Sequence, residues 1–69
     1  MKINVTPIQD VKAGDKILST ADGKIWEANA LLQENHHCYV LVLMRDERGV
    51  RLYDNHLLGK HALVDVVEQ

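Results

Sequence analysis

The chain has 69 residues, of which 46% are hydrophobic and 26% charged, and its formal net charge is −2. This composition excludes a disordered chain, and the length predicts a single small domain, residues 1–69, with a thin core. The weakly acidic charge lacks the basic excess that is typical of nucleic-acid-binding domains. Cys38 is the only cysteine, which excludes an internal disulfide, and no apolar run is long enough for a membrane span. We therefore expect a cytoplasmic protein without signal peptide or membrane anchor.

Short strands are predicted for the first part of the chain. Ile3 and Val5 alternate with polar residues over residues 2–6, and this pattern predicts a strand that ends at Pro7, a residue that favours the edge of a sheet. Residues 15–19 form the next predicted strand, after a turn at residues 13–15. The dipeptide Asp22-Gly23 then indicates a hairpin in which Gly23 adopts a positive φ angle.

Residues 25–35 fit both a strand and a helix. Their Glu, Ala, Leu and Gln content favours a helix, whereas Trp26, Ala28, Ala30 and Leu32 alternate with polar residues as in a strand. The hairpin signal directly before the segment, and the absence of a capping residue there, favour the strand.

The centre of the sequence is a predicted β-hairpin. Residues 39–44 are an unbroken apolar run rich in β-branched side chains, and the strand that contains them spans residues 38–46. A charged turn with a glycine follows at residues 46–49, and residues 50–54 alternate between apolar and polar as a second strand.

One short helical turn and a last strand complete the predicted fold. Residues 55–58 before Gly59 predict the helical turn, and residues 62–67 predict the strand. The fold class is therefore mostly β, with five to six strands. In its order of elements, the segment from residue 15 to residue 67 resembles the SH3-like small barrel. The aromatic groove with which SH3 domains bind proline-rich peptides is not implied, because the chain lacks the aromatic residues to build it.

A second resemblance concerns the start of the chain. Residues 11–18, followed by Asp22-Gly23, are similar to the opening of Hint and intein barrels, which splice or cleave protein. That activity is not implied, since no Cys or Ser nucleophile begins the chain and no His-Asn pair ends it. No Gly-rich phosphate loop, HExxH or GxSxG motif occurs either, so we expect a protein that is not an enzyme and has no cofactor.

The apolar run of the central hairpin leads to the main functional hypothesis. We expect Val40, Val42 and Met44 to fill the core, which leaves the intervening side chains on the opposite face. One surface would then join six residues: Leu31, Tyr39, Leu41, Leu43, Leu63 and Val67. Only the strand of residues 2–6 is available to cover this surface, and large exposed apolar patches mark interfaces. The sequence therefore favours a non-catalytic protein-interaction module or accessory subunit. We expect it to bind a protein partner and to form a homodimer.

Nucleic-acid binding is the first alternative. Small barrels bind nucleic acid through strand faces and loops, and a set of suitable residues surrounds the hairpin tip: Arg45, Arg48, Arg51 and Tyr53. Asp46 and Glu47 lie in the same region, however, and cross-strand ion pairs explain the cluster without a ligand.

A small zinc-binding or hydrolytic domain is the second alternative. Nitrogen and sulfur ligands are present at His36, His37, Cys38, His56 and His61. On a strand the two outer members of the histidine-histidine-cysteine triplet share a face, so the triplet supplies two ligands at most, and the remaining histidines match no metal-binding spacing. Cys38 as a nucleophile needs a base and an orienting group. The simpler interpretation is a structural thiol in a polar loop.

Overall fold

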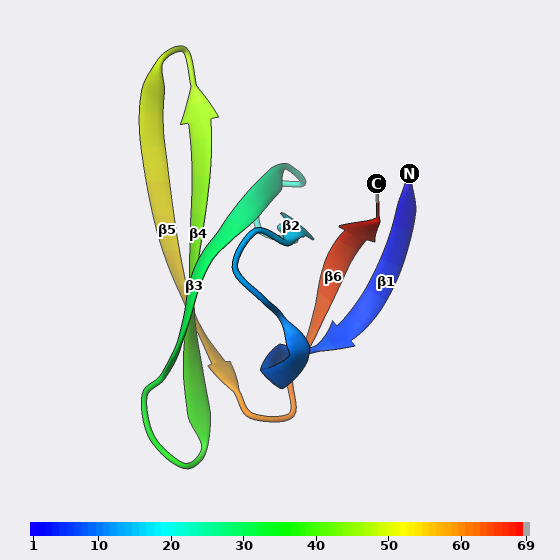
Figure 1. Ribbon diagram of the computed structural model, residues 1–69, viewed down its shortest axis with the longest axis vertical. Helices are drawn as coiled ribbons and strands as arrows, with labels where there is room; N and C mark the ends of the chain where they lie inside the picture. The colour runs from blue at the N-terminus through cyan, green and yellow to red at the C-terminus, as the bar shows by residue number, and fades with distance from the viewer. Residues whose placement is uncertain (69) are drawn as a thin grey trace.

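The computed structural model describes residues 1–68, which form one six-stranded antiparallel sheet in the order β1-β6-β2-β3-β4-β5 (Figure 1). Its elements are β1 (Lys2–Pro7), the 3-10 turn η1 (Ile8–Asp10), β2 (Lys16–Leu18), β3 (Ile25–Gln33), β4 (Cys38–Glu47), β5 (Val50–Gly59) and β6 (Leu63–Glu68). The predicted mostly β class is confirmed. The sheet is open, because β1 and β5 stand at its two ends and neither pairs with the other in the part of the chain that is described.

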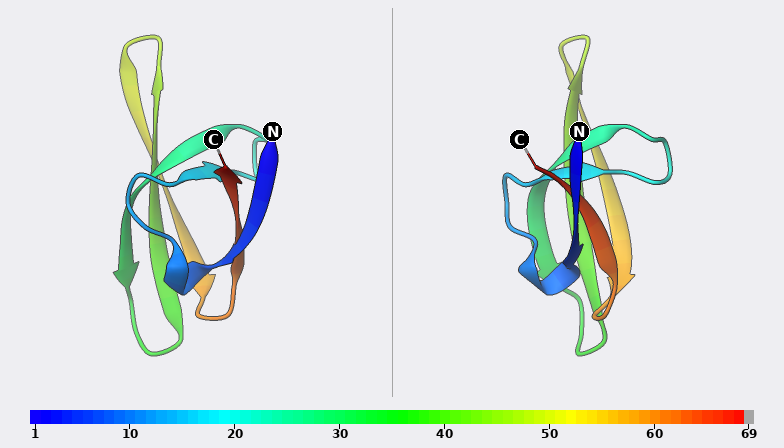
Figure 2. Two further views of the ribbon diagram at one scale, coloured as in Figure 1. Left: turned by 45° about the vertical axis from the view of Figure 1, so that its right-hand side comes forward. Right: turned by 90° about the vertical axis from the view of Figure 1, so that its right-hand side faces the viewer.

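Strand β3 joins the two halves of the curled sheet. The first residues of β3 pair with β2 and the later ones with β4, and Glu27 takes part in both ladders. The register to β4 shifts between Ala28 and Ala30, which makes Asn29 the extra residue of a β-bulge. Bulges bend a strand and increase its twist, so the β4–β5 hairpin and the β1–β6 pair lie on opposite sides of the molecule (Figure 1 and Figure 2).

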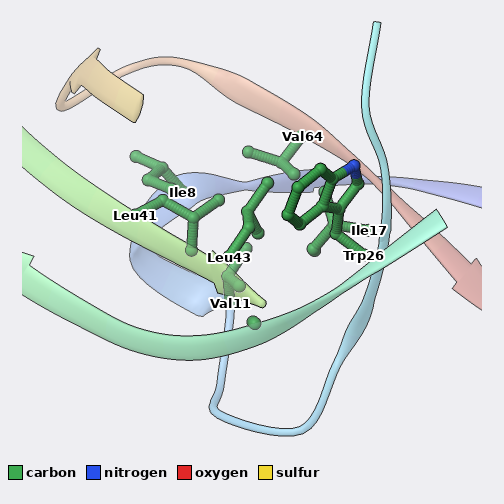
Figure 3. Packing of buried hydrophobic residues seen from close by; sticks show 8 residues of the cluster. Ile8, Val11, Ile17, Trp26, Leu41, Leu43 and Val64 are labelled. Atoms are coloured by element: carbon green, nitrogen blue, oxygen red, sulfur yellow. The ribbon is translucent and has the colours of Figure 1, made fainter. Parts of the chain in front are cut away.

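The core lies inside this curl and is built almost entirely from aliphatic side chains. Trp26 is its only aromatic member, and it packs among residues from β2, β4 and β6 (Figure 3). The turn η1 and the residue after it close one end of the core, with Ile8 fully buried and Val11 nearly so. The eight buried residues of the cluster are Ile8, Val11, Ile17, Trp26, Ala28, Leu41, Leu43 and Val64.

Three local predictions are confirmed. Residues 25–33 of the ambiguous segment form strand β3. Gly23 has a φ angle of 70° in the connection between the paired strands β2 and β3. The strand that ends at Pro7 stands at one edge of the sheet, as proline predicts.

The prediction of a helical turn at residues 55–58 is wrong. Strand β5 continues without interruption to Gly59, which pairs with Cys38 at the far end of β4. The ten-residue partner strand offers hydrogen bonds along this whole length, and that pairing overrides the weak local preference of the segment. The helical turn of this fold is η1 instead.

The predicted facing of the central strand is also wrong. Leu41 and Leu43 are each only 2% exposed and lie in the core, whereas Val40, Val42 and Met44 point to the opposite face. Strand β4 is apolar on both faces, so its alternation does not distinguish them, and the bulge of β3 then turns Leu31 and not Leu32 toward the side of Leu41. Finally, no helix in residues 1–68 is long and apolar enough to cross a membrane.

Candidate protein-interaction surface

The convex side of strands β3, β4 and β5 carries apolar side chains that the chain does not bury. Directly opposed residues of antiparallel strands share a face, so the strand registers define this side. Its members, hereafter the outer surface, are Leu32, Val40, Val42, Met44, Tyr53 and Leu57. The surface forms because β4 is apolar on both of its faces and only one of them meets the core.

The outer surface is continuous across three strands. Leu32 of β3 pairs with Val40 of β4, which in turn pairs with Leu57 of β5. Met44 and Tyr53 form a further cross-strand pair. Leu32 is 56% exposed and Leu57 is 67% exposed, while the β4 members between them are half-buried by their neighbours.

No element of the described chain covers the outer surface. The strand of residues 2–6, which the sequence offered as a cover, lies in β1 and pairs with β6 at the other end of the sheet. The two hairpin connections at the ends of β4 continue its own strands and do not fold over the face (Figure 1 and Figure 2). This surface is therefore open to a partner.

The six interface residues expected from the sequence do not share a surface. Leu41 and Leu43 are inside the core, and Leu31 and Tyr39 pack against it. The last two members lie on β6: Leu63 is 66% exposed at the start of that strand, and Val67 is partly buried opposite residues of β1 and β2. Sequence reasoning found the strand with two apolar faces but missed which face is free, and the one local signal was the apolar Leu31, which breaks the alternation of apolar and polar residues in β3.

Strand β5 adds an open backbone edge to the outer surface. The two-residue turn Arg48-Gly49 closes on the pair Glu47–Val50, and hydrogen-bonded pairs alternate from there along β5. The even-numbered residues of β5 therefore bond to β4. The N–H and C=O groups of the odd-numbered residues, among them Tyr53, Asn55 and Leu57, point away from the sheet, where the described chain offers no strand.

The arginines near the hairpin tip are divided between the two faces. Arg45 lies on the inner face, where its Nη1 donates a hydrogen bond to the Ile25 carbonyl at 3.1 Å. Arg51 lies on the outer face and donates to Asp46 at 3.1 Å. Hydrogen bonds to Asp46 and then to Tyr53 raise the pKa of Arg51, so its charge is paired within the hairpin. The cross-strand ion pair predicted for this hairpin end is confirmed.

A shallow cleft opens on the inner side between β5 and the strands β2 and β6. Its floor is apolar, and Ser19 and His56 line its rim. The His56 Nε2 and Asp54 Oδ2 atoms are 2.9 Å apart, but no hydrogen bond in residues 1–68 joins His56 to Ser19, whose Oγ accepts from the amide of Ala21. With a volume of about 120 Å³ the cleft is smaller than the roughly 300 Å³ at which ligand pockets begin.

The remaining candidate ligands and nucleophile are scattered. Cys38 is half-buried at the start of β4, and its amide and that of His37 both donate to the Asn35 side chain, which shapes the β3–β4 turn. His36 and His61 are exposed in separate turns. Residues 1–68 contain no group of three His, Cys, Asp or Glu side chains placed to hold a metal ion.

Known proteins give no functional information about this chain. No family model, curated protein or solved structure matches the chain. The functional conclusion therefore depends on the outer surface and the open edge of β5.

Proposed function

We propose that this chain is a non-catalytic protein-interaction module, or an accessory subunit of a larger assembly, that acts as a homodimer. The observation that carries the proposal is the outer surface, a three-strand apolar face that the chain itself leaves uncovered. Contiguous apolar patches of this kind are rare on monomeric proteins and mark sites of association. In a domain of 69 residues, a second copy supplies part of the burial that one short chain does not provide.

Two further points belong to the proposal. The curl of one sheet around a single core supports an open variant of the SH3-like small barrel as the fold. The free thiol of Cys38 suits a reducing compartment, and we place the homodimer in the cytoplasm on that ground.

Sedimentation equilibrium at micromolar concentration tests the homodimer. Leu57→Lys places a charge on the most exposed part of the outer surface without touching the core, and a twofold interface contains the substitution twice. A loss of roughly 1.5 kcal/mol per copy weakens the dimer by about 100-fold. Val5→Lys is the matched control, because Val5 is 61% exposed and lies on β1 at the opposite end of the sheet.

The expected result is a dimer for the unmodified chain and for Val5→Lys, and a folded monomer for Leu57→Lys. A monomeric unmodified chain contradicts the proposal. A dimer that Leu57→Lys leaves intact contradicts the participation of the outer surface.

A further inference from the structure

The two edges of the sheet differ in how they are protected against pairing. Strand β1 has six residues, carries Lys2 and ends at Pro7, which are features that discourage a further strand. Strand β5 has ten residues, contains no proline or lysine, and keeps a regular register with β4. A long, regular edge whose only charged side chains are Arg51 and Asp54 is a template for strand addition.

The sequence of β5 is self-complementary about Asn55. Reading outward from this residue, Asp54 faces His56, Tyr53 faces Leu57, and Leu52 faces Leu58, so the match covers residues 52–58 and ends at Arg51, whose counterpart is Gly59. An antiparallel pair of identical strands brings these counterparts together. We propose that two copies of this chain join by antiparallel pairing of their β5 strands, with Asn55 opposite Asn55 on the twofold axis.

This inference rests on the proposed homodimer and specifies how the copies join. In this register the odd-numbered residues, whose backbone groups point outward, form the new hydrogen-bonded pairs. Tyr53 of one copy and Leu57 of the other meet on the outer face, so the pairing buries these two exposed members of each outer surface against each other and leaves the β3 and β4 members as one continuous open face. Leu52 and Leu58 of the second copy meet on the inner face, in the more closely spaced non-hydrogen-bonded pairs.

Charge selects this register over its neighbours. Because only odd-numbered residues offer outward backbone groups, the pairing shifts in steps of two residues. One such shift places Asp54 opposite Asp54, and like charges directly opposed are unfavourable. The opposite shift places His56 opposite His56 and so separates His56 from Asp54 of the other copy. The central register places Asp54 of each copy opposite His56 of the other. His56 already bonds Asp54 of its own chain through Nε2, and its imidazole has a second ring nitrogen for the second copy.

Disulfide trapping tests the register. In a Cys38→Ser chain, which removes the native thiol, Asn55→Cys places one thiol of each copy at the axis, with Cα atoms about 5.5 Å apart and within disulfide range. Arg51→Cys is the matched control on the same face of the same strand. Its two copies are separated by eight residues along the strands, or about 27 Å. Under mild oxidation at micromolar concentration, we expect Asn55→Cys to form a linked dimer at least about tenfold faster than Arg51→Cys.

Several outcomes overturn the inference. Equal rates for the two cysteine variants indicate random collision and refute the register. If sedimentation shows a dimer that Leu57→Lys weakens, yet Asn55→Cys does not cross-link, β5 pairing is refuted while the homodimer stands. A monomeric chain refutes both proposals.

A proline variant checks the backbone pairing without an added thiol. The Asn55 amide points away from β4, so Asn55→Pro removes a donor from the open edge and none from the β4–β5 ladder. We expect a folded chain, shown by an unchanged circular dichroism spectrum, whose dimer dissociates at protein concentrations at least tenfold higher than those of the unmodified chain. A folded Asn55→Pro chain that dimerises as before refutes pairing at this edge. If the variant does not fold, the cross-linking rates of Asn55→Cys and Arg51→Cys decide whether the β5 strands pair.

Discussion

Replacing Leu43 with alanine tests the facing of the central strand, on which every proposal above depends. Leu43 is 2% exposed and packs in the core, so its truncation removes buried methyl groups and leaves a cavity. Such a change costs about 2–5 kcal/mol. A domain of 69 residues has a free energy of unfolding of roughly 3–10 kcal/mol. Leu43→Ala should therefore remove about 3 kcal/mol, a third or more of the total.

Leu32→Ala is the control, because it deletes the same atoms from a side chain that is 56% exposed on the outer surface. We expect it to cost about 1 kcal/mol or less. Urea unfolding followed by the fluorescence of Trp26, which lies in the same core cluster as Leu43, measures both changes. With a urea slope of roughly 1 kcal/mol per molar, the midpoint should fall by about 3 M for Leu43→Ala and by less than about 1 M for the control.

All samples must have the same protein concentration, because dimer formation adds a concentration-dependent term to the apparent stability. A Leu43→Ala chain that is unfolded without urea meets the same expectation. Equal losses for the two variants would refute the assignment of Leu43 to the core and of Leu32 to the outer surface.

Three further predictions concern the turns. Gly23→Val should lower the midpoint of thermal unfolding by roughly 4–16 °C, because φ is 70° at this position and a side chain in that conformation costs about 1–2 kcal/mol. The cost comes from the backbone conformation, since no atom lies within 4 Å of the added Cβ. An unchanged midpoint would contradict this prediction. Arg48→Asn should raise the same midpoint, since Arg48 has a φ of 52° and asparagine tolerates it better; a lower midpoint would contradict the turn assignment. Hydrogen bonds from the Lys24 amide and the Trp26 indole lower the pKa of Asp22 below 3.8, so the stability they add is complete above that value and is lost as the pH falls through the lowered pKa. The difference in free energy of unfolding between the unmodified chain and Asp22→Asn should accordingly shrink as the pH falls below 3.8, and a pH-independent difference would contradict the role of this carboxylate.

The sequence by itself determined the features that depend on neighbouring residues. Alternation and β-branched content identified the strands, Asp22-Gly23 located a hairpin, and Pro7 marked an edge. The unbroken apolar run of β4 already indicated a strand with two apolar faces and hence a surface in need of a cover. These signals are local because turn conformation and strand preference are set within a few residues of the chain.

Only the tertiary structure decided which face is free and how far β5 extends. The bulge at Asn29 changes the phase of β3, so Leu31 turns inward with Leu41 while Leu32 turns outward, and no count of alternating residues along β4 contains that information. Likewise, the segment after Asp54 becomes strand because β4 supplies hydrogen bonds for its full length. Strand register depends on two segments at once, and a shift of one residue moves every side chain of a strand to the other face of the sheet. The outer surface and the open edge of β5 therefore follow from strand pairing and not from local preference.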